Sequence, residues 1–480
     1  MGHCSSYDEM RTVDTSIALE MLAKAEELGT VIPSNIVPGP FVQLAADNND
    51  LNEETLDGKN TTHATTMVVF QRKSFGPFQP QSPIADQRDR RRSLQSSSTI
   101  YEIQECSAHG RRPAVSAYVE NGSPEWYVGE NEVFRKTSYN DVIWALLRLN
   151  PTSLRQPLIT EEEKQSVPGW SGFNALLYPD MPRQSNIGYC PMIDGCSTEL
   201  KHAQLISASL GQEDTVITFD LLIYMKAKQI QWRFPNEISD VVIRMGGFHI
   251  ALNFLSVVGK KYLNSGLDDL LIESGVYAAG STSALLKGKS YNRGVRAHKL
   301  TMEALFRLMW RSFVQWYNSS YAERRNNEED VLQKIADGVS DVKNKSDVRQ
   351  RVEDLEGDLT GLTCDFEEFK SKASVKSKMF VFWESYGDMI NVLLQFIKAE
   401  RTGNWELHLS SVAMDRPNYA RWLPVYLADM NQLERKHPLV YRSLLEEIIL
   451  SAVQDNRFHR CRPTWRWNSL LMLIQREWEE

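Results

Sequence analysis

The sequence predicts an α/β protein: a mixed sheet that contains a large insertion and is followed by a mainly α-helical region. Short apolar and β-branched runs at 41–47, 62–71, 215–220 and 241–245 predict strands. The last two runs pass directly into helical patterns, which is typical of α/β sheets. Between 295 and 400 the apolar residues recur mostly at spacings of three and four, which predicts helices.

Bulk composition indicates a globular intracellular protein. Hydrophobic residues make up 42% of the 480 residues and charged residues 24%. No apolar run is long enough to span a bilayer and the start of the chain has no signal-peptide segment, so we expect no membrane partner. The net charge of −8 argues against nucleic-acid binding over the whole surface, although it leaves room for a local basic face.

The N-terminal segment predicts a helix followed by a hairpin. Residues 8–28 place Met10, Val13 and Ile17 at roughly helical spacing, and Gly29 ends the pattern. A proline-rich connector leads into the first strand, and Asp57-Gly58 is a hairpin-turn signal before the returning strand at 62–71.

A compositional change marks the insertion. Residues 74–98 are rich in Pro, Ser, Gln and Arg and predict a flexible linker, and 100–204 show no clean periodicity. The strands on both sides of this segment are still expected to share one sheet, because exposed strand edges would be costly.

The second half predicts long helices. The spacing of apolar residues in 328–370 fits a helical hairpin or a short coiled coil, through which two chains can self-associate. Further helices are expected at 380–400 and 417–436. The expected parts are therefore an N-terminal helix and linker (1–40), the first part of the α/β core (41–75), the insertion (76–204), the second part of the core (205–294), a helical region (295–400), C-terminal helices (401–446) and a tail (447–480).

Two acidic residues are placed where strands are predicted to end. Asp47 would end the first strand and Asp220 a later one. Ribonuclease-H-like nucleases use carboxylates at neighbouring strand ends, with a third from a following helix, to hold two divalent ions. Oxygen ligands suit Mg²⁺ or Mn²⁺. Alternatively, Asp47 and Asp50 are turn formers and Asp220 caps the next helix.

One histidine stands at a predicted strand-to-helix junction. His249 follows a Gly-Gly turn in "RMGGFHIALNFL". It would lie near a phosphate or a metal, or it packs beside the paired glycines as a structural residue.

The clearest basic cluster predicts contact with a nucleic-acid backbone, and its alternative is a solvated helix face. The cluster consists of Lys287, Lys289, Tyr291, Arg293, Arg296 and Lys299. A P-loop is excluded, because it requires glycine where the chain has Ser283. The common hydrolase, zincin and dinucleotide-binding motifs are absent.

Four stretches carry a resemblance to a known family. They are "ADNNDLNEETLDGKNTTHATTMVVFQ", "VVIRMGGFHIALNFLSVVGKK", "YNRGVRAHKLTMEALFRLMW" and "RTGNWELHL". They resemble a multicopy, mobile-element-like family of marine-invertebrate and some vertebrate genomes, and the resemblance covers most of 10–442. Together with the acidic strand ends, the insertion and the strand–turn–His–helix unit, it implies a DDE-type, ribonuclease-H-like transposase. DNA as partner, a nuclear location and a Mg or Mn cofactor follow from that implication.

The C-terminal tail departs from this resemblance. Members of the family continue with a segment like "TDMALE", whereas residues 447–480 resemble a translation of such a segment in a shifted frame. The lost segment is the best candidate for the helix with the third carboxylate, and otherwise Glu273, Glu303 and Asp415 are the candidates. We therefore expect a catalytically impaired copy. The alternative is a non-enzymatic protein whose helices bind a partner and whose acids are structural.

Overall fold

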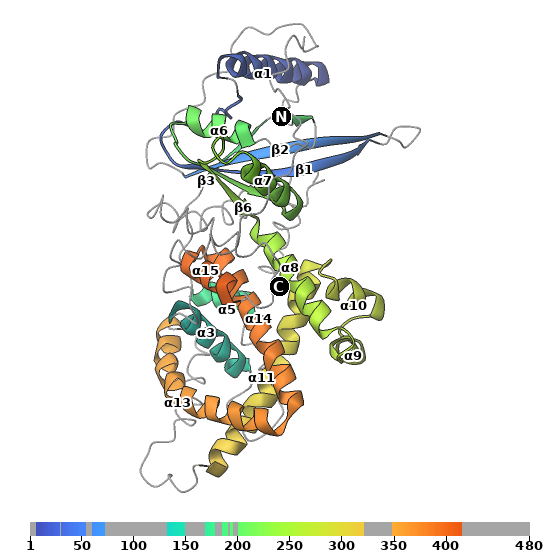
Figure 1. The fold of residues 1–480 in the computed structure, drawn as a ribbon, viewed down its shortest axis with the longest axis vertical. Coiled ribbons are helices and arrows are strands. Elements are labelled where there is room, and N and C mark those ends of the chain that lie inside the picture. The colour runs from blue at the N-terminus through green and yellow to red at the C-terminus, as the bar shows by residue number, and fades with distance from the viewer. Residues whose placement is uncertain are drawn as a thin grey trace. The chain divides into compact units, whose positions relative to one another are not determined.

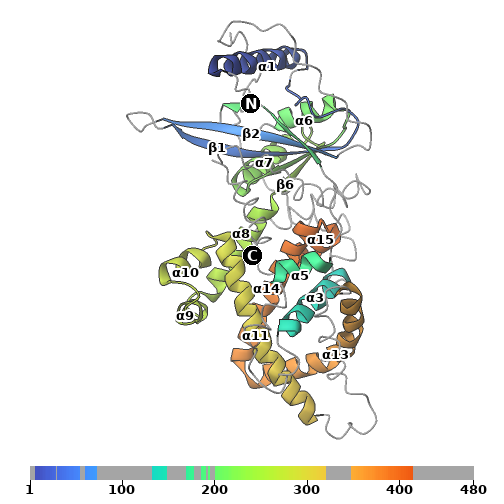
Figure 2. The same ribbon diagram turned by 180° about the vertical axis from the view of Figure 1, so that it is seen from behind.

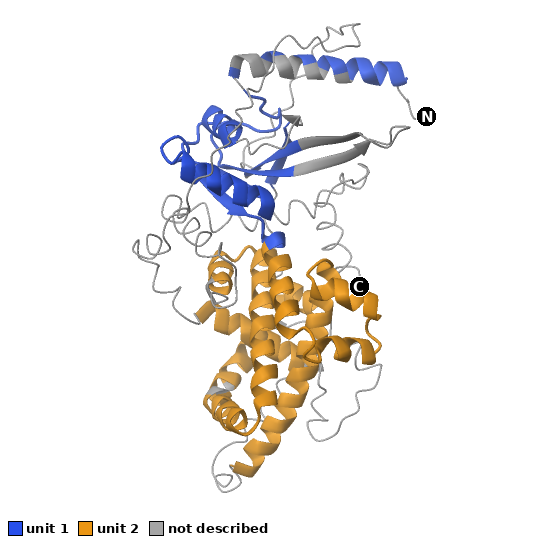
Figure 3. Cartoon of the chain, turned by 45° about the vertical axis from the view of Figure 1, so that its right-hand side comes forward, with its two compact units in different colours: residues 1–120, 182–249, 428–468 blue, residues 121–181, 250–427, 469–480 orange. Residues whose placement is uncertain are grey.

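The computed structural model describes residues 6–28, 30–53, 60–72, 132–148, 169–177, 185–190, 193–194, 200–320 and 348–414. These residues form two compact units (Figure 1, Figure 3). The sheet unit contains the described residues up to 72 and those from 185 to 249. The helical unit contains those of 132–177 and 250–414. Two separate stretches of chain therefore build the helical unit.

The sheet unit is built on six strands. They are β1 (Val42–Glu53), β2 (Asn60–Arg72), β3 (Ser185–Tyr189), β4 (Ile193–Asp194), β5 (Thr215–Phe219) and β6 (Val241–Met245). The order is β3-β2-β1-β5-β6, and β4 also pairs with β2. Pairing is antiparallel from β3 to β1 and parallel from β1 through β5 to β6. The four strands predicted from apolar runs thus share one mixed sheet, as expected.

The core of this unit lies along β1, β5 and β6. Every residue of β5 and β6 is buried, which explains their mainly apolar and β-branched sequences. Helices α6 (Leu200–Ser209) and α7 (Leu221–Arg233) lie before and after β5 in the chain. Helix α8 (Gly247–Tyr262) follows β6 and carries the chain into the helical unit. Helix α1 (Tyr7–Leu28) agrees with the predicted N-terminal helix.

The predicted insertion, 76–204, includes part of the sheet. Strands β3 and β4 lie within it, and β3 pairs with β2 over five residues. The sequence "SNIGY" lacks a strand pattern because it contains a glycine, Gly188, between Ile187 and Tyr189. A Cβ there would come within 2.6 Å of Ile36 and 2.7 Å of Pro33, so the connector that covers this strand requires glycine. The segment that leaves the sheet is shorter than predicted and ends before Ser185.

Two helices from that segment belong to the helical unit. They are α3 (Glu132–Arg148) and α5 (Trp170–Leu177). Besides most of α8, the described helices of the unit are α9 (Leu267–Glu273), α10 (Ala279–Leu286), α11 (Tyr291–Ser320), α13 (Val348–Lys376), α14 (Lys378–Thr402) and α15 (Trp405–Met414). The predicted helix at 417–436 and the tail at 447–480 lie outside the described residues, as does the Asp57-Gly58 turn.

A buried polar cluster fastens α3 and α5 to α14. Asp141 Oδ1 accepts hydrogen bonds from Lys398 Nζ at 2.9 Å and Trp170 Nε1 at 2.8 Å. Asp141 Oδ2 accepts one from Gln395 Nε2 at 2.6 Å. Burial lowers the pKa of Lys398, and the Asp141 carboxylate opposes that effect. Removing one partner would leave a buried charge uncompensated, so this cluster selects one way of packing the inserted helices.

The apolar residues whose spacing predicted a coiled coil are used for packing within the helical unit. Val352, Leu355, Leu359 and Leu362 are all buried on α13. They belong to the helix that packs on α3, α5, α11 and α14. These positions therefore do not form an exposed surface for a second copy, and residues 328–347 lie outside the described part. Within the described helices, none is both long and apolar enough to cross a membrane.

Glycines let α8 approach α10 and α11 closely. A Cβ at Gly259 would overlap the backbone carbonyl group of Leu286. A Cβ at Gly288 would be 2.7 Å from Leu252 O, and one at Gly294 would be 3.2 Å from Leu255 Cδ1. The glycines of "VVGKK" and "KGKSYNRG" therefore serve helix packing.

We predict that Gly259→Ala lowers the free energy of unfolding of the helical unit by about 2–3 kcal/mol, because the backbone of α10 must move to admit the methyl group. Gly280→Ala is the matched control, since a Cβ there has no neighbour within 4 Å. It is expected to be neutral or slightly stabilising. Hydrogen exchange of the α8 and α11 amides measures both variants. Equal protection in the two would contradict the packing argument.

Candidate functional site

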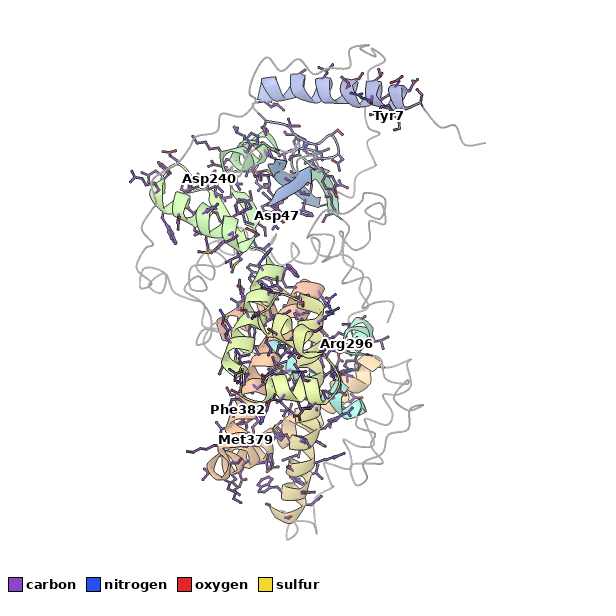
Figure 4. All side chains as sticks on the ribbon, turned by 90° about the vertical axis from the view of Figure 1, so that its right-hand side faces the viewer. Tyr7, Asp47, Asp240, Arg296, Met379 and Phe382 are labelled. Atoms are coloured by element: carbon purple, nitrogen blue, oxygen red, sulfur yellow. The ribbon has the colours of Figure 1, made fainter. Side chains whose placement is uncertain are left out.

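The register between β1 and β5 brings Asp47 and Asp220 together. Leu44, Ala45 and Ala46 pair in parallel with Ile217, Thr218 and Phe219. The next residue on each segment is Asp47 and Asp220, so both leave the paired region at the same level. Neighbouring strands are roughly 5 Å apart, which places the two carboxylates at one edge of the sheet. Figure 4 labels Asp47 on the sheet unit.

Asp47 does not end its strand. Strand β1 continues to Glu53, because its antiparallel pairing with β2 runs from Val42↔Gln71 to Glu53↔Asn60. The polar residues after Asp47 were predicted as a turn, but β2 supplies their backbone hydrogen bonds, and the two strands continue as a ribbon (Figure 2). The turn-former interpretation of Asp47 and Asp50 is therefore wrong. Asp47 stands where β1 continues beyond its parallel partner.

Asp220 caps helix α7, as the structural alternative predicted. Its backbone is extended, with φ −65° and ψ 171°, and its Oδ1 accepts a hydrogen bond from Ile223 N at 2.7 Å. A carboxylate offers two oxygens with about four lone-pair sites. Capping uses one of these sites, so it is compatible with binding a cation through the others.

The histidine lies at the same edge as the two carboxylates. Gly246 N donates to Phe219 O at 2.9 Å, and His249 N donates to Gly246 O at 3.0 Å. A Cβ on Gly246 would lie 3.7 Å from His249 Cδ2 and 3.8 Å from Thr218 Cγ2. The imidazole is therefore close to the carboxyl ends of β5 and β6. Thr218 pairs with Ala45, so it points to the face that Asp47, two residues further on, also shares.

Sequence reasoning missed Arg244 on this face. It pairs with Thr218 across β5 and β6 and is only 4% exposed. The sequence did contain a signal for this residue, because an arginine within the otherwise apolar run "VVIRM" is unusual. A buried cation on the face that carries Asp47 favours negative charge there. Within the described residues, no group of three or more His, Cys, Asp or Glu side chains is arranged to hold a metal ion. At this edge the structure therefore places two carboxylates, Asp47 and Asp220, which follow paired residues of β1 and β5.

Two of the other candidates for the third carboxylate, Glu303 and Glu273, belong to the helical unit. Glu303 lies on α11 and pairs with Arg307 at 2.6 Å. Glu273 ends α9, which also belongs to the helical unit. Asp415 lies outside the described residues.

The predicted basic cluster divides into exposed and inward-facing parts. Lys287, Lys289, Arg293 and Arg296 are exposed at the turn from α10 to α11, and Tyr291 is half-buried. Lys299 instead lies over the Trp170 ring at 5.3 Å, near Lys398 and Arg401, which face the same ring. It therefore contributes to packing of the helical unit.

Tyr277 joins the exposed part of the cluster, although sequence reasoning passed over it. Its hydroxyl donates to Arg293 O at 3.2 Å. Burial raises its pKa, and the nearby Arg296 and Arg293 guanidinium groups oppose that rise. An aromatic ring beside two guanidinium groups suits contact with a nucleic-acid strand. An aromatic residue in the loop just before α10 was the only signal in the sequence.

Comparison with known proteins identifies a family model that matches more than half of the chain. The family described as "Domain of unknown function (DUF8702)" matches residues 169–464. The match includes β3 to β6 and the helices from α5 to α15. No curated protein and no solved structure matches the chain.

We predict that Asp220→Ala destabilises the sheet unit by about 1 kcal/mol, because the Ile223 amide loses its acceptor. Asp220→Asn should stay within a few tenths of a kcal/mol of the unchanged chain, since asparagine caps helices equally well. Hydrogen exchange of the β5 and α7 amides separates the two variants. Identical losses would show that the charge, and not the cap, stabilises this junction.

Proposed function

The chain belongs to the DUF8702 family, and we propose that it is a nucleic-acid-processing protein of the ribonuclease-H-like kind, derived from a mobile-element transposase. In this proposal Asp47 and Asp220 hold a divalent cation, Mg²⁺ or Mn²⁺. The observation that carries it is the parallel register of β1 and β5, which aligns the two carboxylates.

The sheet topology supports the proposal. Three antiparallel strands, β3-β2-β1, are extended beyond β1 by two parallel strands, β5 and β6, each followed by a helix. Ribonuclease-H-like sheets have this order and these directions, with one acid on the first strand and another at the end of the first parallel strand. This argument is an analogy between folds, so the site residues must carry the function.

The chemistry follows from the ligands. Two carboxylates leave most positions around Mg²⁺ or Mn²⁺ to water and phosphate oxygens, which is how Mg²⁺ is commonly bound. Such an ion activates the attacking oxygen and stabilises the leaving one in phosphodiester cleavage or transfer. With a shifted frame after Glu446, the helix expected to bear the third carboxylate is lost. We therefore propose weak cation binding and impaired catalysis in this copy.

The exposed basic residues supply the proposed nucleic-acid surface. Lys287, Lys289 and Arg293 surround a turn whose shape is fixed by Gly288 against α8. Basic side chains on a turn of fixed backbone conformation lose little conformational entropy when they bind phosphates. DNA as the partner, and the nuclear location that it implies, are parts of this proposal.

A second candidate function is a non-enzymatic interaction protein. The observation that favours it is the outer face of α11, where the exposed arginines Arg296 and Arg311 stand beside the exposed leucines Leu300 and Leu308. This surface is compatible with both candidates.

We predict that Mn²⁺ raises the stability of the sheet unit by RT ln(1 + [Mn²⁺]/Kd), which is about 1.4 kcal/mol at ten times the Kd. Asp47→Asn and Asp220→Asn should each abolish this rise, because each removes a charged oxygen ligand. Calorimetric melting with and without Mn²⁺ measures the effect.

Asp240→Asn is the matched control for the Mn²⁺ experiment. Asp240 precedes β6 at the opposite, amino-terminal end of the strand, and its Oδ1 accepts from Gln204 Nε2 at 2.7 Å. An asparagine carbonyl can accept the same bond, so this variant should retain the full response. The metal proposal fails if all four proteins respond equally or if none responds at any soluble Mn²⁺ concentration.

We also predict salt-dependent binding of duplex DNA. Replacing Lys287, Lys289 and Arg293 with Ala should reduce the slope of log K against log salt by about 3, one per lost phosphate contact. Fluorescence anisotropy over a series of KCl concentrations measures the slope. Lys376→Ala with Lys378→Ala is the control, since these exposed lysines flank the distant α13–α14 junction. Binding that does not depend on salt, or equal slopes for both variants, would favour a solvated helix face.

A further inference from the structure

The outer face of α11 combines exposed basic and exposed apolar side chains. Arg296, Leu300, Ala304, Leu308 and Arg311 recur at spacings of three and four and are all exposed. Leu300 is 40% exposed and Leu308 is 61% exposed. We call these five residues the α11 stripe, and Figure 4 labels Arg296 at one end of it. Large apolar side chains that stand exposed between charges are typical of a surface that contacts another protein.

The charge of α11 indicates what kind of surface can cover this stripe. The 30 residues of the helix contain five cations and one carboxylate, a net charge of +4, and that carboxylate, Glu303, pairs with Arg307 of the same helix. The inner face of the helix is buried through residues such as Trp310 and Phe313. A matching surface should therefore combine carboxylates with exposed apolar side chains.

The α11 stripe of a second copy does not meet this requirement. Two antiparallel stripes that cross at Ala304 would bring Arg296 of each copy close to Arg311 of the other, and two parallel stripes would bring equivalent arginines together. Like charges that face each other across an interface oppose association. The stripe therefore requires a different and acidic surface.

Helix α9 of the same unit has an acidic and apolar outer face. Its inner residues Leu267 and Leu271 are buried and anchor the helix. Leu270 is 42%, Ile272 38% and Val276 42% exposed. The segment from Leu267 to Val276 contains three carboxylates and no Lys or Arg. We call its exposed residues that share this mixed character the α9 face, which consists of Asp269, Leu270, Ile272, Glu273 and Val276.

Backbone hydrogen bonds at the end of α9 hold this face in one conformation. Gly275 has a φ of 70°, and its amide donates to Ile272 O at 3.0 Å. The amide of Tyr277 donates to Leu271 O at 3.2 Å, so Val276 is held beside the helix. A surface whose backbone is already fixed loses little conformational entropy when it binds a partner.

We propose that the α9 face of one copy of this chain docks on the α11 stripe of a second copy. Asp269 and Glu273, one helical turn apart, supply the negative charge that the arginines of the stripe require, and the apolar residues of the two surfaces pack against each other. Both surfaces belong to the helical unit, so every copy carries both. In a twofold dimer the contact is made twice, so two modest contacts act together.

This inference names a partner for the second candidate function and does not depend on the metal site. Asp47 and Asp220 belong to the sheet unit, so a failure of Mn²⁺ binding leaves the proposed contact untouched. The nucleic-acid proposal rests mainly on Lys287, Lys289 and Arg293, which lie outside the α11 stripe. Leucines offer nothing to phosphates, so the stripe suits an acidic protein surface better than a nucleic-acid backbone.

Analytical ultracentrifugation of the full chain tests the inference. We expect a monomer–dimer equilibrium whose dissociation constant increases with salt, because the opposite charges are screened. Arg296→Glu with Arg311→Glu should raise that constant at least tenfold, and so should Asp269→Arg with Glu273→Arg. Lys376→Glu with Lys378→Glu is the matched control for the arginine variant, since it changes the net charge equally at exposed lysines of the same unit. The control should dimerise like the unchanged chain.

Mixing the two charge-reversed variants separates a lost contact from a misfolded chain. The acidic stripe of the first variant then faces the basic α9 face of the second, and the unchanged surfaces of the two chains also match. Each variant alone should remain largely monomeric at a concentration where an equal mixture of the two forms dimers. A chain that carries all four substitutions should likewise regain its own dimerisation.

Four results would overturn the proposal. They are an unchanged chain that is monomeric at all concentrations, a dimer that tolerates both double substitutions, a dimer that the control weakens as much as the arginine variant does, and two monomeric variants that fail to associate when mixed. If Arg296→Glu with Arg311→Glu abolishes binding of duplex DNA in fluorescence anisotropy and leaves the dimer intact, the stripe belongs to a nucleic-acid surface instead.

Discussion

The side-chain amide of Gln212 holds the start of β1 through two hydrogen bonds. Val42 N donates to its Oε1 at 2.9 Å, and its Nε2 donates to Val42 O at 3.1 Å. Gln43 Nε2 donates to Thr218 Oγ1 at 3.0 Å one step further along the pair. These contacts join segments that are 170 and more positions apart and fix their register. A slip of one residue would turn Asp47 to the opposite face of the sheet, so the candidate site depends on this register.

The strands that could be predicted from the sequence are those whose own apolar and β-branched residues indicate that they are buried. The runs at 215–219 and 241–245 are mainly apolar and β-branched because every residue in them is buried. Strand β3 could not be found in this way, since Gly188 is required by the connector that packs on it and β2 provides its pairing. The full length of β1 was missed for a related reason, because its polar half is held by the partner strand. Both segments are strands because β2 pairs with them. The local sequence pattern gives no information about such pairing.

The sequence predicted which residues form the candidate site, but it did not predict how they are arranged. Asp47, Asp220 and His249 were all named from residue type and position, and the structure brings them to one edge of the sheet. The sequence could not show that Asp220 both caps α7 and lines up with Asp47, because that depends on register. Nor could it separate Lys299, which faces Trp170, from its exposed neighbours. The basic cluster was identified by charge, and only packing shows which cations face solvent.

Two separate features therefore support the proposed nucleic-acid-processing function, one in the sheet unit and one in the helical unit. The sheet aligns two acids at its carboxyl edge, and the helices offer basic surfaces whose exposure is fixed by glycine-mediated packing. The central claim is that Asp47 and Asp220 share one cation, and anomalous diffraction from crystals grown with Mn²⁺ tests it most directly. The account predicts an anomalous peak between the two carboxylates, within ligand distance of an oxygen from each. A Mn²⁺ peak elsewhere with this edge empty, or a crystal structure in which β1 and β5 are not neighbours, would contradict it.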